Sequence, residues 1–136
     1  MVMSRSLSRE AAFMLLFEYV VRGDETAEEI HENAEAIPNF KESPYTRKVF
    51  FESIEHIDEI NAVVEKCLVG WRKERVSFVS RAILILATYE MMYVDDVPYK
   101  VAIDEAISIS KKYDDDKAYS FVNGVLNAVA EQLSLK

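Results

Sequence analysis

The chain is poor in the residues that sheets, disulfides and most metal sites depend on. Its 136 residues include one cysteine, two histidines, three glycines and three prolines. So few turn-forming residues argue against a many-stranded sheet, and an apolar fraction of one half argues against disorder. The lone Cys67 cannot form an internal disulfide, which fits a reducing compartment. No charged segment followed by an apolar stretch opens the sequence, so we expect a cytoplasmic protein without an export signal.

The sequence also lacks a clean apolar stretch long enough for a membrane helix. Its longest apolar run, residues 78–94, contains Arg81 and Glu90. A helix that crosses a bilayer needs about 20 predominantly apolar residues. The run therefore predicts a buried helix of a soluble bundle, and we expect no contact with a membrane.

Helix signals recur along the chain with short breaks between them. Apolar residues at three-and-four spacing, N-cap residues, prolines and glycines together predict roughly seven helices and no strand. A chain of this length is sufficient for one core, and no repeat or linker divides it. We predict an all-α, single-domain bundle over residues 1–136. The expected helices run from about Ser6 to Val21, from Thr26 to before Pro38, from Pro44 to Glu55, from Asp58 to Gly70, from Val79 onward, from Ala102 to Tyr113, and from Ala118 to Leu133.

Two details of packing follow from the same periodicity. Leu7, Ala11, Leu15 and Tyr19 share one stripe of the first helix, so we expect this stripe to face the core. Gly124 lies inside an apolar helical pattern, where glycine costs roughly 1 kcal/mol relative to alanine. Such a glycine suggests close packing of the backbone against a neighbouring element.

Patterns typical of catalysis or metal binding are nearly absent. Glu28 and His31 form one Glu-x-x-His, but a di-iron bundle needs this motif on two helices. Residues 114–116 are three aspartates, yet the glycine and glutamate of an EF-hand loop do not follow them. There is no glycine-rich phosphate loop and no Gly-x-Ser-x-Gly elbow. We therefore predict no enzyme, no metal and no cofactor.

The charge is unevenly distributed. The formal net charge of −8 opposes non-specific binding to nucleic acid. Arg5 and Arg9 open the first helix, and three further basic residues follow Trp71. These cations suit either a small phosphate-contacting surface flanked by aromatic rings or ordinary solvated helix ends, and charge alone leaves both interpretations open. The acidic side chains concentrate in one segment without Lys or Arg, at Asp24, Glu25, Glu28, Glu29, Glu32 and Glu35.

Three blocks carry a resemblance to a known family. Residues 5–17 read RSLSREAAFMLLF, residues 97–106 read VPYKVAIDEA, and residues 121–126 read FVNGVL. Together with Trp71, Arg75 and the segments 81–84 and 89–91, they resemble the NusB family, the all-helical bacterial transcription antitermination factors. The resemblance covers nearly the whole chain and is weakest from residue 24 to 41. Ser6, Leu7, Met14 and Ser80 depart from the family pattern, which has arginines at the first two positions, glutamine at the third and commonly an acid at the fourth.

The resemblance implies a factor that binds the boxA element of single-stranded RNA together with the ribosomal protein NusE, in the antitermination complex of RNA polymerase on ribosomal RNA operons. In that family, RNA lies along the first helix and near the start of the last. The residues carried over as RNA contacts are Arg5, Arg9, Phe17, Lys117 and Phe121. Tyr119 is added here as a candidate stacking side chain, and Glu74 and Ser80 are expected near NusE.

Other interpretations stay open beside this one. Phe17 and Phe121 suit the apolar stripes of their helices as well as an RNA contact, and Tyr119 suits an ordinary surface position. The missing arginines would also fit a protein–protein adaptor with weak or no RNA binding. A related domain precedes some ribosomal RNA methyltransferases, but we expect no catalysis, since a chain ending at Lys136 has no room for a cofactor-binding domain. Self-association into a homodimer is equally open, because apolar surface patches are not visible in a sequence.

Overall fold

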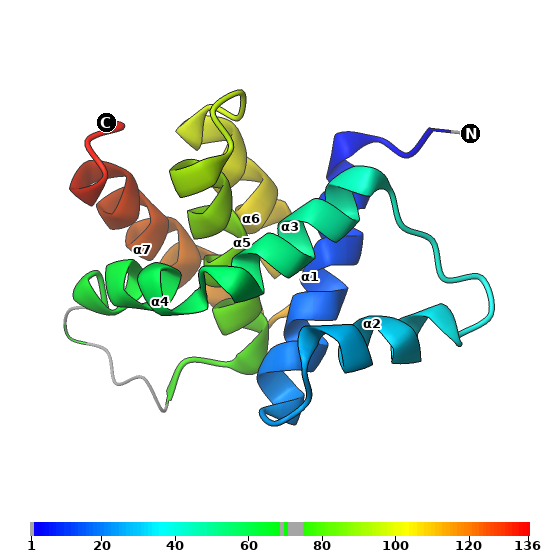
Figure 1. Cartoon of the computed structure of the whole chain (residues 1–136). Helices are drawn as coiled ribbons and strands as arrows, with labels where there is room; N and C mark the ends of the chain where they lie inside the picture. Colours follow the sequence, from blue (N-terminus) through cyan, green and yellow to red (C-terminus); the bar gives the residue numbers. More distant parts are fainter. Residues whose placement is uncertain (1, 69, 71–74) are drawn as a thin grey trace.

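The computed structural model describes residues 2–68, 70 and 75–136, and over this part of the chain it is all-helical, as predicted. Figure 1 shows the helices packed around α5, with α2 and α3 on one side and α7 on the other. The described helices are α1 (Arg5–Arg22), α2 (Ala27–Glu35), α3 (Pro44–Glu55), α4 (Ile57–Lys66), α5 (Phe78–Tyr93), α6 (Tyr99–Tyr113) and α7 (Ala118–Gln132).

The helix boundaries follow from the capping residues. Thr26 and Glu29 form the predicted capping box at the start of α2. Ser43 caps α3, and its side chain accepts a hydrogen bond from the backbone N–H of Thr46, with proline at the first helical position. Gly23 ends α1 with a φ of 74°, a left-handed conformation that glycine adopts without a steric penalty.

Helix α5 forms the centre of the core. Every residue from Ala82 to Met91 is buried, so this part of the helix is covered on all of its faces. A helix that is apolar all round must be covered on all sides, and α5 is packed against α1, α3, α4, α6 and α7. Among the described residues, no helix is long and apolar enough to span a bilayer.

The predicted inward stripe of α1 is wrong in part. Leu7 is 55% exposed, whereas Ser8 and Arg9 beside it are buried. The helix is rotated because these two polar side chains find partners inside: Ser8 at the start of α3 and Arg9 on α5. A prediction from apolar periodicity does not detect buried polar side chains such as Ser8 and Arg9, so it assigned the wrong face of α1 to the core.

The prediction for Gly124 is also wrong. It is exposed, and a Cβ built at this position meets no atom within 4 Å. Helix α7 buries its other side, including Val122, Val125 and Val129. The glycine is therefore not required by packing within the described chain.

Candidate nucleic-acid interface

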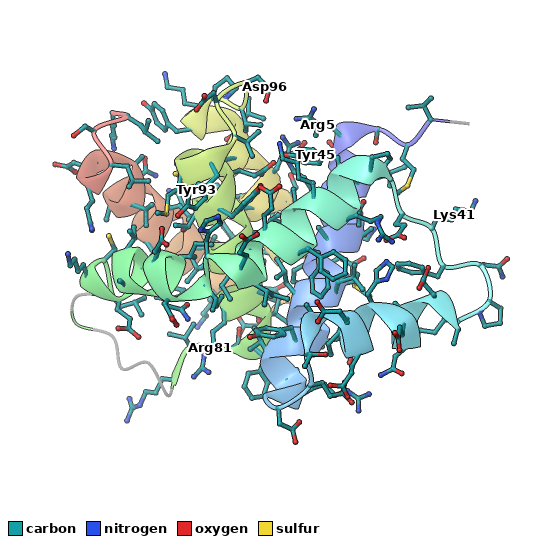
Figure 2. All side chains as sticks on the ribbon, viewed as in Figure 1. Arg5, Lys41, Tyr45, Arg81, Tyr93 and Asp96 are labelled. Carbon is teal, nitrogen blue, oxygen red and sulfur yellow. The ribbon has the colours of Figure 1, made fainter. Side chains whose placement is uncertain are left out.

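Arg5 is the exposed cation at the beginning of α1. Its guanidinium carbon lies 3.9 Å from the centroid of the Tyr45 ring, and Figure 2 shows the two side chains together at this end of the molecule. One carboxylate oxygen of Asp96 is 4.0 Å from Arg5, but Asp96 is 75% exposed, and such pairs contribute little. Arg5 is thus held by an aromatic face and remains accessible to an anion.

Arg9 requires a correction, because its side chain is only 4% exposed. Its Nε donates to both carboxylate oxygens of Glu90, at 3.0 and 2.8 Å, and another nitrogen donates to Glu105 at 3.0 Å. Burial lowers the pKa of Arg9, but the hydrogen bonds and charge of Glu90 outweigh it and the pKa is raised. An RNA phosphate cannot reach this enclosed guanidinium, so the prediction of Arg9 as a phosphate contact is wrong for this structure.

Tyr45 connects these two arginines. Its hydroxyl donates a hydrogen bond to Glu90, the carboxylate that binds Arg9. The guanidinium of Arg5 lies over the Tyr45 ring. Burial, followed by the hydrogen bond to Glu90, raises the pKa of Tyr45, so the hydroxyl stays protonated and keeps donating. No local pattern in the sequence indicates this role, because Tyr45 lies on α3, some forty residues from both arginines.

Phe17 is half-buried and packs against the core. Its ring centroid is 6.3 Å from that of Phe13 on the preceding turn. This placement is a structural one, and a contact between Phe17 and RNA stays a prediction.

The start of α7 gathers several of the other predicted residues. Lys117 is exposed at the N-cap position, and Tyr119 is 39% exposed with the Lys111 ammonium 4.7 Å from its ring centroid. Phe121 is half-buried against the core. A pocket of about 200 Å³ opens here, lined by Arg75, Val76, Ser77, Ser80, Asp114, Asp115, Lys117, Ala118 and Phe121.

Ser80 belongs to the wall of this pocket and not to the outer surface. It is 2% exposed, and its hydroxyl donates to Asp114 at 2.8 Å, as does the hydroxyl of Ser77. The buried hydroxyl is held inside the chain, and the expected position of Ser80 near NusE stays a prediction. Glu74, the other residue expected there, lies outside the described residues.

Two of the three aspartates before α7, Asp114 and Asp115, have a structural role that sequence reasoning missed. Asp114 accepts hydrogen bonds from the N-terminal turn of α5, and Asp115 accepts from the backbone N–H groups of Lys117 and Ala118 at 3.0 Å each. These carboxylates join α5 to α7 and start α7. An Asp placed to accept from residues two and three positions later is the signal that identifies such a cap.

The two groups of candidate residues lie at opposite ends of α6. Asp96, beside Arg5, precedes this helix, and Lys117 follows it. Fifteen helical residues span about 22 Å, so no compact ligand contacts both groups. The structure brings Lys117 and Phe121 together and leaves Arg5 apart, and only an extended ligand such as a nucleic-acid strand would reach both.

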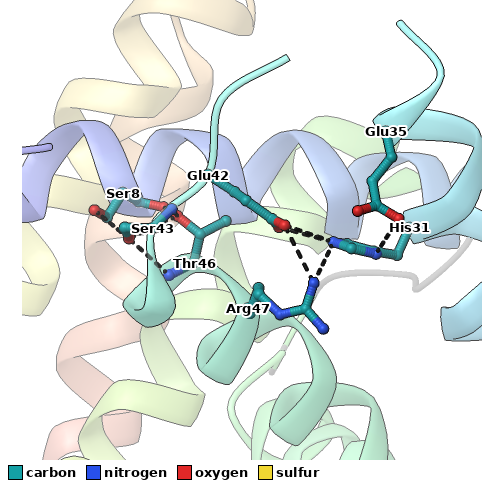
Figure 3. A network of polar contacts seen from close by, with 7 residues as sticks. All are labelled: Ser8, His31, Glu35, Glu42, Ser43, Thr46 and Arg47. Carbon is teal, nitrogen blue, oxygen red and sulfur yellow. Dashed lines mark hydrogen bonds and ion pairs between the residues drawn. The ribbon is translucent and has the colours of Figure 1, made fainter.

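A separate polar cluster surrounds His31 and is drawn in Figure 3. Its Nε2 lies 2.8 Å from Glu42, its Nδ1 lies 3.4 Å from Glu35, and Arg47 lies 3.1 Å from Nε2. One ligand atom from each of His31, Glu35 and Glu42 lies within 4.8 Å of the others, but in this arrangement the two carboxylates face different nitrogens of the ring. The guanidinium of Arg47 already bridges Nε2 and Glu42, and the cluster fastens α2 to the start of α3.

Comparison with known proteins decides the family. A family model described as the NusB family matches residues 6–131. The chain belongs to the NusB family. The transcription antitermination protein NusB of Bacillus subtilis is 37% identical over 131 residues, which cover 96% of this chain and 98% of that protein.

Solved NusB structures share the fold. The structure of T. maritima NusB superposes with a TM-score of 0.85 at 34% identity, covering 97% of this chain and 94% of the other. A crystal structure of the antitermination factors NusB and NusE with double-stranded RNA contains a chain with a TM-score of 0.82 at 30% identity, covering 94% and 96%. The resemblance stated from the sequence is therefore confirmed, as is the NusB-like helical fold.

Proposed function

We propose that this NusB-family protein is a transcription antitermination factor that binds boxA-type single-stranded RNA together with the ribosomal protein NusE. It acts in the cytoplasm, in the antitermination complex of RNA polymerase on ribosomal RNA operons, as one helical domain without catalytic activity. Its relatives named as transcription antitermination proteins, and the solved assembly of a NusB with NusE and RNA, support this proposal.

The observation that carries the proposal for RNA is the exposed Arg5 on the Tyr45 ring. An arginine preordered on an aromatic face loses less conformational freedom when it binds a phosphate. Lys117 and Tyr119 present a second cation and a second accessible ring at the start of α7. Phosphate contacts and stacking of bases on aromatic rings are the two elements of single-strand binding.

The net charge of −8 limits what the isolated protein achieves. Repulsion between the acidic chain and RNA opposes the few exposed cations, so binding by this protein alone is weak and strongly dependent on salt. A basic ribosomal protein is attracted to an acidic partner and brings positive charge to the complex. NusE therefore tightens RNA binding.

The test measures binding of a boxA-containing single strand and a scrambled strand, with and without NusE, across a salt series. We expect a preference for boxA that NusE strengthens and salt weakens. Equal affinity for the two strands under both conditions would reject the proposal for RNA.

A second function, that of a protein–protein adaptor, is favoured by one specific observation. Arg9 is buried and exposed Leu7 stands where the family pattern has arginine, so α1 presents fewer cations to RNA than the family pattern provides. An adaptor would bind NusE with full affinity in the experiment above and show no boxA preference. Substitution of Arg5 by alanine would then change neither result.

A further inference from the structure

The cations near the start of α1 continue onto α3 and not along α1. Lys48 is exposed on α3, one helical turn after Tyr45, so that the two side chains are neighbours. By contrast, the outward side of α1 after Arg5 presents Leu7, 55% exposed, and Met14, 47% exposed. The path of positive charge that begins at Arg5 therefore turns toward α3.

Lys48 is free to bind an anion. Among the described residues its ammonium has no ion pair or hydrogen bond, and the acid one turn further on, Glu52, accepts a hydrogen bond from the hydroxyl of Tyr89 at 2.6 Å. Neither the first turn of α1 nor that of α3 contains an acidic residue. The first turns of these two helices thus add no negative charge beside Arg5 and Lys48, and the acid near Arg5 is the exposed Asp96, 4.0 Å away.

The position of Arg5 is fixed through a chain of contacts that ends in the core. Tyr45 is held by its hydrogen bond to Glu90, and Glu90 is held by two hydrogen bonds from buried Arg9. The start of α3 is attached to α1 independently, because the Ser43 hydroxyl donates to that of Ser8 at 2.7 Å. This attachment joins the helix that carries Lys48 to the helix that carries Arg5, and such support from the scaffold is what a binding site needs.

We propose that Arg5 and Lys48 form a binding site for consecutive phosphates of one RNA strand. Tyr45 is the positioning residue, because its ring holds the Arg5 guanidinium. This inference rests on the proposed RNA function and adds α3 to the surface that RNA follows. Arg9 does not contact RNA in this proposal. It binds Glu90, which accepts the hydrogen bond of the Tyr45 hydroxyl, and so it helps to hold Tyr45 in place.

The experiment measures binding of a single-stranded boxA RNA to the protein with NusE, over a salt series, for four variants. They are Arg5→Ala, Lys48→Ala, the double variant, and Lys66→Ala as a matched control at an exposed lysine on the far end of α4. Each lost phosphate contact lowers the slope of log affinity against log salt by about 0.7, which corresponds to about fivefold in affinity at roughly 0.1 M salt. We expect this change for Lys48→Ala and for Arg5→Ala, twice this change in slope for the double variant, and none for Lys66→Ala.

A double-mutant cycle tests the role of Tyr45. Tyr45→Leu removes the ring, and we expect it to weaken RNA binding in the wild-type background but not in the Arg5→Ala background, because the ring acts only through Arg5. Thermal unfolding of each variant separates a loss of fold from a loss of contact. Equal effects of Tyr45→Leu in both backgrounds would overturn the positioning role.

The possible failures are distinguishable from one another. RNA binding that keeps its affinity and slope in Lys48→Ala and in the double variant would overturn the site on α3 while leaving the antitermination function intact. Absence of RNA binding by the unchanged protein, with NusE present, would reject the proposed function and this site with it.

Discussion

At the scale of single residues, the buried Arg9 is the side chain whose loss we expect to cost most. Its removal leaves Glu90 in the core and Glu105 at its edge without their cation, and breaking a buried ion pair on one side costs about 3–5 kcal/mol. We predict this loss in the free energy of unfolding for Arg9→Ala, measured by urea denaturation. The control is Arg22→Ala, whose exposed pair with Glu18 should cost less than about 1 kcal/mol. Similar losses in the two variants would show that the pair with Glu90 is not stabilising.

Two glycines provide a matched pair with opposite expectations. Gly124 is helical and a Cβ there meets nothing within 4 Å, so Gly124→Ala should stabilise the protein by about 0.5–1 kcal/mol through lower entropy of the unfolded chain. Gly23 has equal space but a φ of 74°, so Gly23→Ala should destabilise by about 1 kcal/mol. Thermal unfolding of both variants checks this. A gain in stability from both substitutions would contradict the argument from backbone conformation.

At the scale of helices, a surface carboxylate, Glu10, adds to the contact between α1 and α6 that the buried Arg9 also makes through Glu105. Glu10 accepts hydrogen bonds from Lys112, at 2.6 Å, and from the Tyr113 hydroxyl, and these lower the pKa of Glu10. A lowered pKa stabilises the fold above the unfolded value, near 4.5, and this contribution is lost as pH falls through the folded value. We predict that Glu10→Gln destabilises the protein at pH 7 and that the difference from wild type shrinks toward pH 3.

Urea denaturation at pH 7, 5 and 3 measures this difference. Glu131→Gln is the control, because Glu131 is exposed on α7 and its side chain makes no ion pair or hydrogen bond among the described residues. A difference between Glu10→Gln and wild type that stays constant with pH would mean that the charge of Glu10 is not what joins α1 to α6.

The existence of the helices was predictable from the sequence, and so were their ends where a capping residue defines them. Local caps such as Thr26 with Glu29 specify a boundary within four residues of chain. The expected bounds were wrong for α4, which ends at Lys66 and not at Gly70, and for α6, which begins at Tyr99 and not at Ala102.

The faces that the helices bury were predictable only where those faces are apolar. The face of α1 depends on Arg9 meeting Glu90, eighty-one residues away, and no local pattern contains that pairing. The same limit applies to Tyr45, whose importance arises from contacts with α1 and α5 that exist only in the folded chain.

At the scale of the whole molecule, the residues that the family resemblance proposes for RNA and for NusE differ in how accessible they are. The resemblance pointed to Arg5 and to the start of α7, which the structure places accessibly at the two ends of α6. It also pointed to Arg9 and Ser80, which are buried. A motif transfers residue types from position to position, but exposure depends on the partners that each position finds in this particular chain.

The acidic side chains of α2 and of the turn before it contribute to the electrostatic field of the whole molecule. Asp24, Glu28 and Glu32 are exposed and their side chains form no ion pair among the described residues. Replacing them by Asn, Gln and Gln changes the formal net charge from −8 to −5 without touching the capping residue Thr26. A less negative protein attracts a basic partner less and repels RNA less.

We therefore predict opposite effects of this triple variant on the two partners. Association with NusE should slow by roughly three- to tenfold at low salt, with little change in dissociation, because distant charges act on encounter and not on the bound contacts. RNA binding by the protein alone should strengthen under the same conditions. Stopped-flow association and RNA titration measure the two effects, and both should vanish at about 1 M salt, where the screening length is about 3 Å. An effect on dissociation from NusE that persists at high salt would mean that α2 contacts the partner directly.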